Sequence, residues 1–105
     1  MPVTDEAVEL AVALGRATRP EGAKVVNEVK EYVRFGAGPR GSQALVLAAK
    51  ARAALRGEAC ADVDDIREMV VPVLRHRLVL SFRAEAEGVK DVDVLRAVLE
   101  RVNST

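Results

Sequence analysis

Arg40 is the residue of this 105-residue chain whose type and position best suit chemistry. It follows Gly36-Ala37-Gly38, whose glycines let the backbone turn sharply, and Pro39, which suits the first position of a helix because its missing N–H is not needed there. Arg40 would then lie in the first helical turn, where the helix dipole favours an anion and a cation costs about 0.3–1 kcal/mol. An arginine held beside free helix N–H groups forms a corner suited to phosphate. A solvated surface arginine remains the alternative from the residues alone.

Few other side chains could build a catalytic or metal site. The chain has one histidine and one cysteine, His76 and Cys60, which provide neither a metal site at useful spacing nor an internal disulfide. Asp62, Asp64 and Asp65 come at the start of a predicted helix, where capping explains them better than a bound cation. The sequence contains no G-x-x-x-x-G-K-[ST] phosphate loop, no G-x-S-x-G motif and no H-E-x-x-H pair. We therefore expect no metal site and no enzyme that is complete in this chain.

The segment Arg75-His76-Arg77 leaves two interpretations open. The arginines could pair with carboxylates of another domain or subunit, with the histidine in the same contact. Alternatively, the arginines are ordinary surface charges and His76 is a half-buried histidine on a helix.

Composition narrows the possible partners and the compartment. The net charge is zero, and the aromatic residues are only Tyr32, Phe35 and Phe82. Nucleic-acid binding needs a basic surface and often stacking aromatics, so we expect no nucleic-acid partner. The start lacks the basic end and apolar run of a signal peptide, and no stretch approaches the roughly 20 apolar residues of a membrane span. A lone cysteine fits a reducing compartment, so the expected location is the cytoplasm.

Hydrophobic spacing predicts the helices that must position Arg40. A first helix runs from Thr4, its N-cap, to about Thr18. Its predicted stripe is Ala7, Leu10, Ala11, Leu14 and Ala17, widened by Val8 and Val12. The helix that begins at Pro39 runs to Arg56 and ends at Gly57. Its predicted stripe is Ala44, Leu47, Ala48, Ala51 and Leu55.

The remaining segments complete a predicted helical bundle. Residues 25–35 are expected to form two or three helical turns. A helix capped by Asp62 is interrupted or kinked at Pro72 and continues to Val79. Residues 80–87 alternate apolar and charged side chains, which favours an extended or irregular segment, although Val79, Phe82 and Ala86 would also fit one face of a helix. Asp91 is expected to cap a last helix with a core face of Val94, Leu95, Val98, Leu99 and Val102. The fold class is therefore all-α, with residues 1–105 forming one compact bundle of four to five helices.

The segment around Arg40 resembles the Gly-Ala-Ser-Pro-Arg motif of the MoxR family of AAA+ ATPases, where it opens the third helix of the C-terminal lid domain. The resemblance covers nearly the whole chain. Its further parts are Thr4-Asp5-Glu6, Ala17-Thr18-Arg19-Pro20, Ser42-Gln43-Ala44-Leu45, Ala48-Ala49-Lys50-Ala51, Val73-Leu74-Arg75-His76-Arg77-Leu78 and Ala84-Glu85-Ala86-Glu87-Gly88. Such an ordered series over one domain length is far more specific than a lone Pro-Arg pair.

The resemblance implies a lid that closes over ATP and Mg²⁺, both bound mainly by an N-terminal AAA+ core that is absent from this chain. Arg40 would be the catalytic sensor 2 arginine, which reaches the terminal phosphate and couples the lid angle to the nucleotide state. In this sensor 2 region, residues 36–56, Pro39 would set the helix start, while Gly36 and Gly38 would shape the approach to ATP. The family usually has serine where this chain has Gly38. We expect the lost side-chain cap to cost little stability and to leave the role intact.

The implied partners are the core of the same protein, neighbouring subunits of a hexameric ring, and a protein client that a chaperone-like ATPase remodels or matures. The chain alone would not hydrolyse ATP, because the phosphate loop, the Mg²⁺ ligands and the catalytic carboxylate would belong to the core. A helical adaptor without nucleotide chemistry remains an alternative, and it would leave an apolar groove exposed and Arg40 dispensable. A helix-turn-helix DNA binder is disfavoured by the neutral charge and by the alanine-rich helix after Pro39.

Overall fold

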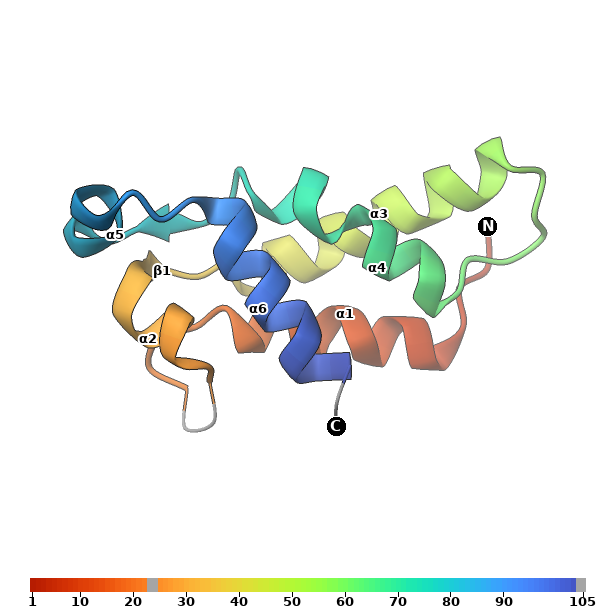
Figure 1. The fold of residues 1–105 in the computed structure, drawn as a ribbon. Coiled ribbons are helices and arrows are strands. Elements are labelled where there is room, and N and C mark those ends of the chain that lie inside the picture. The colour runs from red at the N-terminus through yellow and green to blue at the C-terminus, as the bar shows by residue number, and fades with distance from the viewer. Residues whose placement is uncertain (23–24, 104–105) are drawn as a thin grey trace.

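The computed structural model describes residues 1–22 and 25–103, which form six helices and one two-stranded sheet. The helices are α1 (Asp5–Ala17), α2 (Asn27–Tyr32), α3 (Gly38–Leu55), α4 (Val63–Leu74), α5 (Phe82–Glu87) and α6 (Asp91–Asn103), and the strands are β1 (Val33–Phe35) and β2 (Val79–Leu80). Figure 1 shows α1, α3 and α4 along the length of the molecule, with α6 across them and the short elements at one end. The all-α prediction is confirmed, with six helices in the described residues where four to five were expected.

Helix α1 begins as predicted but buries a narrower face. The Thr4 hydroxyl accepts a hydrogen bond from the Ala7 N–H at 3.1 Å and caps the helix. The buried residues are Ala7, Ala11, Leu14 and Gly15. Val8 and Val12 are 37% and 39% exposed, so they do not widen the core stripe as predicted. Small residues on the buried face let α3 approach α1 closely, which leaves the two valines outside the contact.

Helix α3 turns a different face to the core than the sequence pattern predicted. Its buried residues recur at every fourth position: Gly41, Leu45, Ala49 and Ala53. Leu47 and Leu55 of the predicted stripe are instead 67% and 89% exposed. Alanines on several sides of the helix made the apolar spacing ambiguous. The face rich in small residues is buried because α3 packs against both α1 and α4.

The link between α3 and α4 follows the prediction. Gly57 has a φ of +74°, and the Glu58 N–H bonds to the Ala53 carbonyl at 2.9 Å, which closes the C-terminal end of α3. The Asp62 side chain then accepts the N–H groups of Asp64 and Asp65 and caps α4. Helix α4 buries Ile66, Val70 and Leu74.

Two segments expected to be helical include strands instead. Only the middle of residues 25–35 forms a helix, α2, and the last three residues form β1. Helix α4 contains Pro72 and ends at Leu74, so it does not continue to Val79. The strands pair antiparallel, with Val33 opposite Leu80. Pairing between segments so far apart in the chain leaves no local periodicity that sequence reasoning could have used.

Residues 80–87 show the opposite error, because most of this segment is helical. The Ser81 hydroxyl accepts the Ala84 N–H at 3.2 Å and caps α5, and Gly88, with a φ of +72°, ends it. The serine and the glycine were the local signals of a short helix. The alternation of apolar and charged residues obscured them.

Helix α6 closes the core with the predicted face: Val94, Leu95 and Val98 are buried, and Leu99 and Val102 pack against them. Asp91 is the first helical residue and not the cap that was predicted. The Asp93 carboxylate instead accepts the Lys90 N–H at 3.2 Å, which stabilises the start of the helix from within its first turn. Across the described part of the chain, none of the helices has the length and apolar character needed to cross a bilayer.

Candidate functional site

Arg40 is the third residue of α3 and is exposed. The first turn of α3 contains no acidic residue, and no side chain caps it. Within residues 1–22 and 25–103, no acidic side chain forms an ion pair with Arg40. The first N–H groups of a helix have no partner inside it, so a cation and unsatisfied donors lie together at this corner. Such a corner can bind an anion.

Thr18 ties this corner to the end of α1. Its side chain is fully buried, and its hydroxyl donates to the Gly15 carbonyl at 2.7 Å. The same hydroxyl accepts the N–H of Ala37, the N-cap residue of α3, at 3.0 Å. The sequence indicated Thr18 only as the approximate end of the first helix and as part of a family motif, because the Ala37 contact joins segments 19 residues apart.

A close backbone approach requires glycine at position 36, and a side-chain hydroxyl lies close to Gly15. A Cβ at Gly36 would lie 2.6 Å from the Thr18 carbonyl oxygen, and a Cβ at Gly15 would lie 2.2 Å from the Ser42 hydroxyl. That hydroxyl donates to the Ala11 carbonyl of α1 at 2.9 Å. The structure therefore gives Gly36 a steric reason to be glycine, as sequence analysis expected of a residue that shapes this turn.

Gly38 differs from its expected role as a simple replacement of a serine cap. Its φ is +69°, a conformation that L side chains rarely adopt, and the N-cap of α3 is Ala37. Glycine at position 38 therefore permits the turn. A serine at this position would have a strained backbone and would not be the N-cap residue. Pro39 occupies the start of the helix as predicted.

A groove of about 720 Å³ runs along α1 and α3 beside this corner. Its lining includes Val8 and Val12 of α1, Val46 and Leu47 of α3, Gly38 and Pro39 at the start of α3, and Arg16 and Arg19 at the end of α1. The groove is thus mainly apolar, with two arginines among its lining residues. Sequence reasoning missed it because Val8, Val12 and Leu47 were assigned to the core. The sequence signal that could have revealed the groove is that the apolar residues of these helices cover a wider surface than one buried stripe requires.

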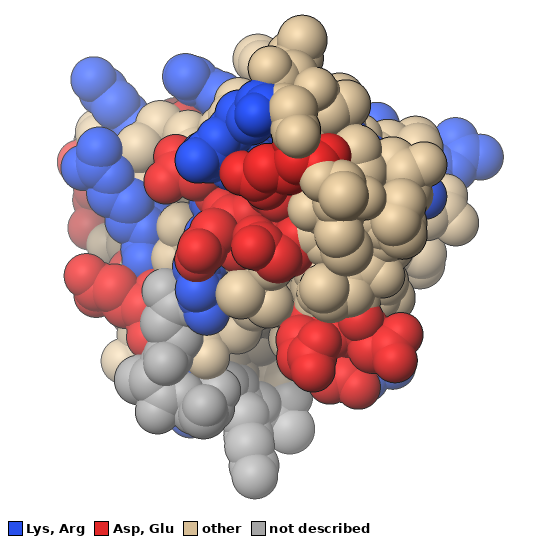
Figure 2. Space-filling view, turned by 90° about the vertical axis from the view of Figure 1, so that its right-hand side faces the viewer, with Lys and Arg blue, Asp and Glu red and all other residues tan. Residues whose placement is uncertain are grey.

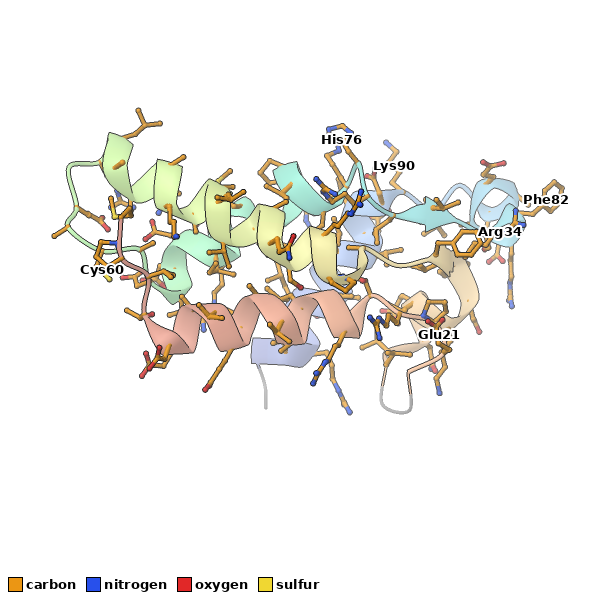
Figure 3. All side chains as sticks on the ribbon, turned by 180° about the vertical axis from the view of Figure 1, so that it is seen from behind. Glu21, Arg34, Cys60, His76, Phe82 and Lys90 are labelled. Atoms are coloured by element: carbon orange, nitrogen blue, oxygen red, sulfur yellow. The ribbon has the colours of Figure 1, made fainter. Side chains whose placement is uncertain are left out.

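The three residues Arg75, His76 and Arg77 follow α4 in a turn and are all exposed. His76 projects away from the bundle in Figure 3, so it is not the half-buried histidine that was one expectation. Arg75 pairs weakly inside the chain, with its Nε 3.8 Å from the Asp91 carboxylate. Arg77 lies near the start of α3, because a Cβ built on Gly41 would be 3.8 Å from its Cδ.

A buried ion pair at the opposite end of α3 was not predicted. Arg52 Nη1 lies 2.5 Å from Asp65 Oδ1, and the Asp65 side chain is 1% exposed. Burial raises the pKa of Asp65, but the Asp62 N–H and the Arg52 guanidinium outweigh it and leave that pKa below its usual value. Figure 2 looks onto this end of the molecule, where acidic and basic side chains lie beside one another. Asp62 and Asp65 use their oxygens for helix capping and for Arg52, in agreement with the capping interpretation.

Comparison with known proteins gives one family and several relatives. A family model of the AAA lid domain matches residues 27–98, a range that contains the Arg40 corner. The chain is 38% identical over 95 residues to Chaperone MoxR1 of Mycobacterium tuberculosis, which covers 90% of this chain and 25% of that protein. It is 45% identical over 54 residues to Protein MoxR of Paracoccus denitrificans, which covers 51% of this chain and 16% of that protein.

A solved structure resembles the whole fold. This chain superposes on a proposed ATPase of Cytophaga hutchinsonii with a TM-score of 0.86 and 26% identity, covering 94% of this chain and 30% of that chain. The chain thus spans about a quarter of the length of MoxR1 and under a third of the solved ATPase.

Proposed function

Because this chain belongs to the AAA lid domain family and is the lid of a MoxR-type AAA+ ATPase, we propose that it closes over ATP held by an AAA+ core. In this proposal, closure couples ATP hydrolysis to the remodelling or maturation of a protein complex, as a chaperone would do. The core and the neighbouring subunits of a hexameric ring are the proposed partners, and the cytoplasm is the proposed location.

The observation that supports this proposal is the exposed Arg40 at an uncapped helix start. A cation in this position opposes the helix dipole and has no acidic partner in the described residues. A bound phosphate would offset the unfavourable dipole interaction and would supply the missing partner. It would accept hydrogen bonds from the helix N–H groups and pair with the guanidinium. Arg40 is therefore the residue that we assign as sensor 2, where it would stabilise charge on the transferring phosphoryl group.

The residues around Arg40 fit ATP better than they fit its metal ion. The first turn of α3 contains no carboxylate, whereas Mg²⁺ prefers oxygen ligands, so the core would hold the metal. The apolar groove between α1 and α3 offers a surface for an uncharged part of the nucleotide or for the core itself. Gly38, where an added Cβ would meet nothing within 4 Å, would let the backbone approach ATP without a side chain in the way, while Gly36 and Pro39 would set the turn and the helix start behind it.

Steady-state ATP turnover by the ATPase that carries this lid tests the proposal. Arg40→Ala should lower turnover about tenfold or more, the order expected when an arginine contact to the transferring phosphate is lost. Arg34→Ala is the matched control, because Arg34 is an exposed arginine that lies over the Phe35 ring and outside the corner. Unchanged turnover in Arg40→Ala would remove the sensor 2 assignment and leave the lid fold intact.

The groove also supports a second candidate function, that of a helical adaptor that binds another protein. An apolar surface left exposed after folding, with Leu47 67% exposed on one wall, is what a docking module would present. The two functions differ in their need for Arg40. A partner that binds the groove equally well with and without Arg40→Ala, in a protein with no ATP turnover, would favour the adaptor.

A further inference from the structure

We propose that Thr18 is a positioning residue for Arg40, a role that rests on the proposed sensor 2 function of Arg40. The Thr18 hydroxyl is fully buried and acts both as a donor and as an acceptor. It donates to α1 through the Gly15 carbonyl and accepts from the turn before α3 through the Ala37 N–H. One hydroxyl thus joins the end of one helix to the beginning of the next.

The position of Thr18 fixes the turn from two sides. The Ala37 N–H is held at 3.0 Å from the hydroxyl oxygen. On the other side, the backbone of Thr18 lies so close to Gly36 that a methyl group there would be 2.6 Å from the Thr18 carbonyl oxygen. The hydrogen bond prevents the turn from moving away, and the steric contact prevents it from moving closer.

Arg40 lies between two points at which α3 is attached to α1. Ala37, three residues before Arg40, bonds to Thr18, and Ser42, two residues after it, bonds to the Ala11 carbonyl at 2.9 Å. A helix between two fixed points has little freedom to rotate or slide. The place on the backbone from which the Arg40 side chain leaves α3 is therefore set relative to α1, and Thr18 supplies the attachment nearest the helix start. A misplaced charge contact of this kind lowers the rate of the chemical step more than it weakens substrate binding.

The test compares Thr18→Val with Thr18→Ser in the full ATPase, with kcat and KM for ATP measured separately. Valine keeps the shape of threonine but loses the hydroxyl, whereas serine keeps the hydroxyl. Thr18→Val removes both hydrogen bonds, and the loss of the one from the Ala37 N–H should lower kcat about fivefold, with a smaller change in KM. Thr18→Ser should stay within about twofold of the unmodified kcat. In an Arg40→Ala background, Thr18→Val should cause no further loss, because both changes remove the same contact.

The outcomes separate this proposal from the proposed function. If Arg40→Ala lowers turnover but Thr18→Val does not, the positioning role of Thr18 is wrong and the sensor 2 role stands. If Arg40→Ala has no effect, the proposed function fails and the positioning role fails with it. An equal loss of kcat from Thr18→Val with and without Arg40 would also overturn the positioning role, since Thr18 would then act independently of Arg40.

A matched control and a measurement on the unmodified protein address simple loss of stability. Ser81 also uses its hydroxyl twice, as a donor to the Glu31 carbonyl and as an acceptor from the Ala84 N–H, but at the α5 end of the molecule. Ser81→Ala should leave kcat unchanged, and a drop equal to that of Thr18→Val would mean that destabilisation alone explains both. In the unmodified ATPase, the Ala37 amide should be protected from hydrogen exchange. Exchange at the rate of an unprotected amide would overturn the proposal even if Thr18→Val did not fold.

Discussion

Helix α3 has an arginine near each end, and the two arginines differ in burial and in the partners available to them. Near the C-terminal end, Arg52 binds the buried carboxylate of Asp65, and the backbone N–H groups of Gly57 and Glu58 bond to the carbonyls of Ala54 and Ala53. At the N-terminal end, Arg40 is exposed, the first turn contains no acidic residue, and no side chain caps the helix. One end of the helix is completed within the chain, and the other is left open.

This difference distinguishes an arginine that stabilises the fold from one that is available to a ligand. Removing the partner of Arg52 would leave a charge in a mostly buried place, which is costly. Arg40 has no acidic partner among residues 1–22 and 25–103, so the fold gains little from it. Its placement against the helix dipole therefore points to a partner outside these residues.

The largest effect should come from breaking the completed end. Asp65→Ala removes the partner of Arg52 and the carboxylate that accepts the Asp62 N–H at 3.0 Å. We expect the free energy of unfolding to fall by about 3 kcal/mol, at the low end for a buried pair because Arg52 is partly exposed. Urea denaturation of this chain measures it. Asp64→Ala is the matched control, since its side chain is 76% exposed and pairs only at the surface with Arg67. Equal losses in the two variants would contradict the assigned role of the Arg52–Asp65 pair.

The dependence of stability on pH should report the same buried carboxylate with a smaller effect. The pKa of Asp65 is lower in the folded chain than its usual value of 3.8, because hydrogen bonds from Asp62 and Arg52 outweigh the effect of burial. The stability that it contributes is therefore complete above the unfolded pKa and is lost as pH falls through the folded pKa. Denaturation at a series of pH values should give a shallower acid loss for Asp65→Asn than for the unmodified chain. Parallel curves would show that other carboxylates, such as exposed Glu87, account for the acid sensitivity.

Features set by neighbouring residues could be predicted from the sequence. The Thr4 cap, the Asp62 cap and the glycine end of α3 depend on residues within a few positions of one another, and all three are confirmed. The corner around Arg40 was located in the same way, from the order Gly-Ala-Gly-Pro-Arg and its resemblance to a family motif. Local rules predicted the turn and the helix start there, but they did not reveal the contact with Thr18 that holds the turn against α1.

Features set by contacts between distant segments could not be predicted. The buried face of α3 was misassigned because many alanines make several faces of the helix equally apolar, and only packing against α1 and α4 decides among them. The Thr18–Ala37 bond and the Arg52–Asp65 pair join residues on different helices or turns, so no spacing in the sequence marks them. The apolar groove was missed for the same reason, because Leu47 was assigned to the core.

The smallest effect is expected at the N-terminal end of α3, where Arg40 has no acidic partner in the described residues. Arg40→Ala should leave the free energy of unfolding of this chain unchanged or raise it by about 0.3 kcal/mol, since it removes a cation from the positive end of the helix dipole. Arg52→Ala is the matched control on the same helix, and it should destabilise the chain clearly because it strands the buried Asp65 carboxylate. Denaturation of both variants in the same buffer measures the difference. A loss in Arg40→Ala as large as that in Arg52→Ala would mean that Arg40 stabilises the fold, and its exposed place at the helix start would then no longer imply a ligand.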